Sequence, residues 1–257
     1  DCEMPLSIQA HPDLALAAKL HARDPAHYPD SNHKPEIAIA LTPFTGLCQF
    51  RERTQIQQDF KRIVALKDAF ADCDIGGDHP DWLRYVYRHL FMASDGDVAA
   101  WIADMVEEIG RLSCRTAADE CFLELQKHFP EDRGTLCAYF MNLVRLEPGQ
   151  AVFLAPCEPH AYLHGTIVEC MANSDNVVRV GLTPKFKDAQ ALIDILDCQP
   201  GAVSLVAGDP NSAEVIYHTP FAEFEVDLLR MRTREGMAMA RAKGRLRGNQ
   251  SKLSIRQ

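Results

Sequence analysis

The 257-residue sequence predicts a mainly β protein with an α-helical insertion, and two changes of hydrophobic pattern support this prediction. Short apolar runs broken by Pro, Asp and Gly, which are typical of strands, occupy residues 1–50 and 143–229. Residues 51–142 instead carry apolar side chains at helical three-to-four spacing. Because short strands without intervening helices form antiparallel barrels or sandwiches, we expect one such β structure, interrupted by a helical block.

The first β region contains three predicted elements. Met4–Ile8 and Glu36–Leu41 are apolar runs that predict strands. Asp13–Ala22 has helical periodicity and predicts a helix between them.

The helical region contains four well-marked segments and a weaker fifth. The periodicity predicts helices over Gln55–Phe70, from Pro80-Asp81 through Leu90, over Asp95–Ser113, over Ala117–Phe129 and in a segment after Arg133.

The second β region begins with two strands joined at Pro148-Gly149, which we interpret as a hairpin turn because Pro fixes φ and Gly accepts a positive φ. Gly165–Met171 and Asn176–Leu182 predict two more strands. We therefore divide the chain into a partial β segment (1–54), a helical insertion (55–142), a β segment that completes the site (143–229) and a basic tail (230–257), which we expect to be disordered or partly helical.

Charge is distributed unevenly along the chain. The tail holds nine Lys and Arg and one Glu, a net charge of +8, so 18 basic and 35 acidic residues leave −17 on residues 1–229. The total of −9 argues against a nucleic-acid or membrane partner, although contact of the tail with RNA or an acidic protein is a less favoured alternative. Nine cysteines without CxxC spacing, and no long uncharged apolar stretch, predict reduced thiols in a soluble, cytoplasmic protein.

The densest group of chemically active residues includes Gln9 and His11, which lie two positions apart and so share one face of a strand. A carboxylate from Glu36 on a neighbouring strand would add to a mixed nitrogen and oxygen set suited to Zn²⁺ or another borderline divalent metal. The stretch Glu158–Gly165, which follows the Pro-Gly turn and contains His160 and His164, could supply the fourth ligand. Spacing alone favours a surface or hydrogen-bonded role for any single histidine.

Four stretches, Leu6–Asp13, Leu20–Glu36, Glu158–Gly165 and Glu169–Asp188, closely resemble type I mannose-6-phosphate isomerases and occur in the same order. The resemblance implies a cupin-type (jelly-roll) β-barrel architecture with an inserted helical domain. It also implies reversible conversion of mannose 6-phosphate, a small-molecule substrate, to fructose 6-phosphate through an enediol(ate). A cytoplasmic monomer active in carbohydrate metabolism and GDP-mannose biosynthesis would follow.

The resemblance assigns roles to individual residues. It implies that Gln9, His11, Glu36 and His160 hold one Zn²⁺ per chain, and that Arg179 is the catalytic arginine.

Other positions match residues that line the family's pocket: Lys34, Glu169, Asp175 and Tyr162. Any of the first three could move the proton, and no base is chosen among them. For Lys34 and Asp175, an ion pair that orients the site is an equal alternative. Ser7, Arg179 and Lys185 are the candidates for binding the phosphate.

The sequence departs from the family at both ends. Members continue well before the block around Ser7 and beyond the region that matches residues 220–229, so we expect an incomplete barrel. The alternative function is therefore a non-catalytic family member that binds metal or sugar phosphate.

Overall fold

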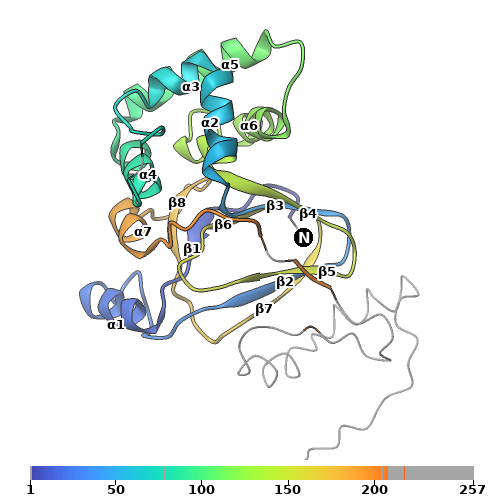
Figure 1. The fold of residues 1–257 in the computed structure, drawn as a ribbon. Helices are drawn as coiled ribbons and strands as arrows, with labels where there is room; N and C mark the ends of the chain where they lie inside the picture. The colour runs from blue at the N-terminus through green and yellow to red at the C-terminus, as the bar shows by residue number, and fades with distance from the viewer. Residues whose placement is uncertain (1, 78, 204, 208–216, 218–257) are drawn as a thin grey trace, which may run out of the picture.

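The computed structural model describes residues 2–77, 79–203, 205–207 and 217, and in it two antiparallel sheets form the β part of the chain (Figure 1). The five-stranded sheet consists, in spatial order, of β4 (Met141–Leu146), β3 (Phe44–Phe50), β6 (His160–His164), β1 (Ile8–Ala10) and β8 (Val178–Gly181). The four-stranded sheet consists of β7 (Ile167–Met171), β2 (Glu36–Ala40), β5 (Gln150–Leu154) and β9 (Leu205–Ala207).

An apolar cluster joins the two sheets. Ala38 and Ala40 of β2 pack in it with Phe44 of β3 and Tyr162 of β6, whereas Ile37 packs in a separate cluster outside it. Since side chains alternate along a strand, Glu36 shares the inward face of Ala38 and Ala40. The strand thus places a carboxylate at one end of the core between the sheets.

The helical block connects β3 to β4 and packs on the outer side of the five-stranded sheet (Figure 1). It contains α2 (Arg53–Arg62), α3 (Val64–Ala69), α4 (Trp82–Met92), α5 (Asp95–Gly110), α6 (Ala117–His128) and the 3₁₀-helix η1 (Arg133–Tyr139). Two further helices, α1 (Leu14–Arg23) and α7 (Ala189–Ile195), lie outside this block. The mainly β fold class with a helical insertion is confirmed.

Several predicted elements have different limits in the structure. The first strand starts only at Ile8, and the helix expected to reach Ser113 ends at Gly110. The single helix predicted over Gln55–Phe70 is two helices, because Ile63 adopts an extended conformation (φ −111°, ψ 109°). The segment after Arg133 is a 3₁₀-helix.

The hairpin predicted at Pro148-Gly149 is wrong. The turn itself is present and Gly149 has the expected positive φ of 91°, but β4 pairs with β3 whereas β5 pairs with β2. The turn is a corner between the two sheets, and the Gly149 main-chain N–H donates to Ala40 O (2.8 Å). A corner and a hairpin use the same turn residues, so the local sequence does not distinguish them.

Within the described residues the two sheets remain separate and open at their edges, as expected for an incomplete barrel. Six of the nine cysteines are buried. None of the described helices has the length and apolar character needed to cross a membrane. The basic tail predicted over 230–257 lies outside the described residues.

Candidate metal centre

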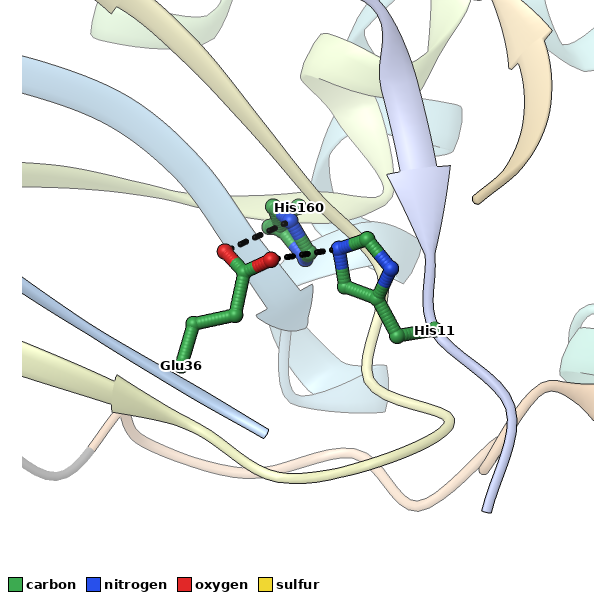
Figure 2. Close-up of side chains that lie close together, drawn as sticks. All are labelled: His11, Glu36 and His160. Carbon is green, nitrogen blue, oxygen red and sulfur yellow. Dashed lines mark ion pairs between the residues drawn. The ribbon is translucent and has the colours of Figure 1, made fainter. Parts of the chain in front are cut away.

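Three buried side chains bring their ligand atoms within 4.8 Å of one another: His11, Glu36 and His160 (Figure 2). His11 Nε2 lies 2.6 Å from Glu36 Oε1, and His160 Nε2 lies 3.7 Å from Glu36 Oε2. The carboxylate therefore faces both imidazole rings, as Figure 2 shows.

Strand pairing positions these groups. β1 lies between β6 and β8, so that Gln9 faces His160 on one side and Arg179 on the other, and His11 follows directly after β1. Glu36 opens β2 in the opposite sheet. The cluster thus joins residues from both sheets at one end of the core.

The hydrogen bonds of the two rings define which nitrogen faces the cluster. His11 Nδ1 donates to the carbonyl oxygen of Asn176 (2.7 Å), and His160 Nδ1 donates to that of Glu158 (3.2 Å). Because a carbonyl only accepts, each neutral ring carries its proton on Nδ1 and points an Nε2 lone pair inward.

This arrangement leaves acceptors facing acceptors. Neither His11 Nε2 nor Glu36 Oε1 has a hydrogen-bond partner, although they lie 2.6 Å apart. Two buried acceptors without a donor between them need a cation, and imidazole nitrogen with carboxylate oxygen is a donor set that Zn²⁺ prefers. The residues therefore fit a zinc ion.

Gln9 adjoins the cluster through its amide. Its Nε2 lies 3.3 Å from His160 Nε2, and its Oε1 accepts a hydrogen bond from Ser7 Oγ (3.1 Å). An amide binds a metal through oxygen, so as a ligand Gln9 must present Oε1 to the ion. Ser7 is half-buried and contacts Gln9 directly.

Glu36 is ionised despite its burial. Burial raises its pKa, but the close contact with the imidazole of His11, and then with that of His160, outweighs this and holds the pKa of Glu36 well below its usual range. Tyr162 Oη donates to Glu36 Oε2 (3.2 Å), and Lys34 Nζ lies 3.6 Å from Oε1. Burial lowers the pKa of His160 to about 4, so this ring is neutral and able to bind a metal.

Two further predicted residues, Glu169 and Arg179, are partly buried in the same region. Burial and then the charge of Glu36, to which Glu169 hydrogen-bonds, raise the pKa of Glu169 well above its ordinary value. Burial lowers the pKa of Arg179, and none of the described residues forms an ion pair with its guanidinium. A carboxyl that titrates near neutrality and an available guanidinium are suited to proton transfer and to stabilising an oxyanion.

The structure does not bring the remaining two predicted residues into contact with the cluster. Lys185 is exposed, and its main-chain N–H donates to Thr183 Oγ1 (3.2 Å). Asp175 is also exposed, and its main-chain N–H donates to Asp30 Oδ2 (2.8 Å).

Sequence reasoning missed Asn176, whose main chain binds His11, and Asp30, which anchors the loop around Asn176. The only sequence signal is the run Asn173-Ser174-Asp175-Asn176, which also fits an ordinary turn.

The sequence resembles proteins of known activity. A family model for the type I phosphomannose isomerase catalytic domain matches residues 1–53. The chain is 41% identical over 240 residues to mannose-6-phosphate isomerase 2 of Arabidopsis thaliana, covering 86% of this chain and 54% of the relative. It is 40% identical over 220 residues to mannose-6-phosphate isomerase of Homo sapiens, covering 78% of this chain and 51% of the relative. The chain thus spans about half the length of these curated relatives.

Solved structures give the same result. A point mutant of phosphomannose isomerase from Salmonella typhimurium matches with a TM-score of 0.78 and 30% identity, covering 85% of this chain and 58% of that one. A zinc-bound mannose 6-phosphate isomerase matches with a TM-score of 0.76 at 30% identity and the same coverage. These similarities confirm the cupin-type architecture.

Proposed function

We propose that this chain, which belongs to the type I phosphomannose isomerase family, forms the zinc centre of an enzyme that interconverts mannose 6-phosphate and fructose 6-phosphate. One observation carries the proposal: His11 Nε2 and Glu36 Oε1 meet without a hydrogen-bond donor, beside the neutral ring of His160. The identity of the substrate is inferred from membership of this family.

Gln9, His11, Glu36 and His160 would hold one Zn²⁺. When bound there, the ion would supply Lewis-acid positive charge that stabilises negative charge on the sugar oxygens. Tyr162 keeps the Glu36 carboxylate in position through its hydrogen bond to Oε2.

We infer that Glu169 moves the proton. Its raised pKa allows a carboxyl to accept and return a proton near neutral pH, and its hydrogen bond to Glu36 places it beside the metal ligands. Lys34, which is 3.6 Å from Glu36, supplies positive charge to the same carboxylate. Asp175 is less suited to this role because its carboxylate is exposed to water, which screens its charge.

Arg179 is proposed to bind the reacting oxygens. Its position opposite Gln9 in the sheet places the start of its side chain beside a metal ligand, and its guanidinium has no ion-pair partner among the described residues. Ser7 and Lys185 are proposed as additional phosphate contacts, Ser7 because it touches Gln9 and Lys185 because it is an exposed cation six residues after Arg179.

The test measures zinc content and isomerisation with the same purified chain. We expect about one zinc per chain and interconversion that a chelator abolishes. Arg179→Ala should lower turnover at least about 100-fold while zinc content is unchanged. The matched control is Arg111→Ala, which removes an exposed arginine at the end of α5 and should leave turnover and zinc content unchanged. Stoichiometric zinc with saturable sugar-phosphate binding but no product would instead support the non-catalytic alternative.

We also propose a cytoplasmic monomer with a small sugar phosphate as substrate, whose product supplies GDP-mannose biosynthesis. These proposals rest on the family resemblance, and cell fractionation with size-exclusion chromatography would test the location and the oligomeric state.

A further inference from the structure

We propose that Asp30 is a positioning residue for His11, acting through the main-chain carbonyl of Asn176. The inference rests on the proposed function, because it takes His11 as a zinc ligand.

Asp30 is the centre of a hydrogen-bond network between two loops. Its Oδ1 accepts from the main-chain N–H of Asn32 (2.8 Å), from Ser174 Oγ (2.9 Å) and from Asn176 Nδ2 (3.1 Å). Its Oδ2 accepts from the main-chain N–H of Asp175 (2.8 Å). One carboxylate therefore binds the segment that leads to β2 and the segment that leads to β8.

Asn176 is fully buried, and its neighbours restrain it on several sides. Its side-chain Nδ2 also donates to the carbonyl oxygens of Asp30 (2.7 Å) and Asn32 (3.2 Å), and its main-chain N–H donates to Ser174 Oγ (3.1 Å). These bonds fix the peptide so that its carbonyl oxygen lies 2.7 Å from His11 Nδ1.

The carbonyl of Asn176 determines both the tautomer and the direction of the His11 ring. With the proton held on Nδ1, the lone pair of Nε2 points at Glu36. Such a partner behind a metal-binding histidine orients the ring and raises its basicity, and its loss typically weakens metal binding 10- to 100-fold.

Asp30 does not act on the cluster directly. Among the described residues, Asn176 is the one hydrogen-bond partner that Asp30 shares with His11, and Asp30 has no hydrogen bond to His11, Glu36 or His160 themselves. Any influence of Asp30 on metal binding must therefore pass through the loop that carries Asn176.

The test compares zinc affinity of metal-free variants by competition with a chromogenic chelator. Asp30→Asn keeps the size of the side chain and one oxygen, but its amide N–H₂ in place of Oδ2 faces the N–H of Asp175. We expect about 10- to 100-fold weaker zinc binding, and a changed visible absorption spectrum of the Co²⁺ form. The matched control is Asp24→Asn in the same connecting segment, where a partly exposed carboxylate accepts from the side chain and main chain of His27.

Other outcomes separate the explanations. Asp30→Asn with zinc affinity within twofold of the unmodified chain would overturn the inference, whereas an unmodified chain that binds no zinc would overturn the proposed function instead. Glu108→Gln removes a cap in the distant helical block and so controls for a general loss of stability. If Glu108→Gln lowered zinc affinity as much as Asp30→Asn does, the inference would also be overturned.

If circular dichroism shows that Asp30→Asn does not fold, Ser174→Ala decides the question. It removes one donor to Asp30 and the acceptor of the Asn176 N–H, and should weaken zinc binding several-fold. An unchanged affinity in a folded Ser174→Ala protein would reject the inference.

Discussion

His160 is a buried base whose proton affinity is coupled to stability. Burial lowers its pKa from 6.5 to about 4, so between these values an unfolded chain binds a proton that the folded chain does not. The metal-free protein should therefore lose stability as the pH falls from about 6.5 to about 4.

His160→Gln should flatten this pH dependence. We expect the free energy of unfolding of the metal-free variant to fall less steeply with pH over the same interval, because the titrating group is absent. Urea unfolding at a series of pH values would measure it, with His27→Gln as the exposed control. Parallel curves for the unmodified chain and His160→Gln would contradict the prediction.

Only part of the candidate centre could be predicted from individual residues. Alternation along a strand placed Gln9 and His11 on one face, but the approach of Glu36 depends on a second sheet whose pairing has no local signature. The role of Asn176 was not predictable, because its main-chain carbonyl makes the contact and any residue type has that group.

At the scale of elements, the interruption at Ile63 shows how a distant residue can end a helix. The apolar periodicity of Gln55–Phe70 is continuous, yet the carboxylate of Glu108 accepts from the main-chain N–H groups of Val64 (2.9 Å) and Ala65 (2.7 Å). These N–H groups open α3 and would otherwise lack partners. Sequence periodicity could not reveal a cap supplied by α5.

Glu108→Gln should destabilise the chain by about 1 kcal/mol, because it removes the negative charge and one of the two acceptors at the start of α3. Chemical denaturation followed by circular dichroism would measure the change. Glu107→Gln is the matched control on the same helix, since Glu107 is exposed and its ion pair within the described part of the chain is with the neighbouring Arg111. Equal effects of the two substitutions would show that the cap contributes nothing.

At the scale of the whole molecule, the candidate ligands connect the two sheets. Gln9 lies in β1 and His160 in β6 of the five-stranded sheet, and His11 directly follows β1. Glu36 belongs to β2 in the other sheet. A bound ion would therefore hold the sheets together at one end of their shared core.

Zinc should accordingly raise the melting temperature of the metal-free chain. A ligand that binds only the folded state stabilises it by about 2.7 kcal/mol when its free concentration is about 100 times Kd. Thermal denaturation with and without zinc would show the shift, and Mg²⁺, which prefers oxygen ligands, should produce little. A shift of the same size in Glu36→Gln would place the responsible site elsewhere.

The overall class was predictable because the hydrophobic period changes twice along the chain. The division of strands between sheets was not: β4 and β5 follow each other closely, but they pair with β3 and β2 respectively. Such pairing depends on packing between distant segments, which short-range turn chemistry does not specify.

The pairing of β3 with β4 also bears on the order of folding. Phe50 faces Met141 across this pair, so the helical block leaves and re-enters the sheet at neighbouring positions (Figure 1). Closing a long flexible loop costs entropy, and a block that collapses early brings its own ends together before the strands meet. We therefore expect the helices to form before β3 and β4 pair, so that a distant strand contact becomes effectively a local one.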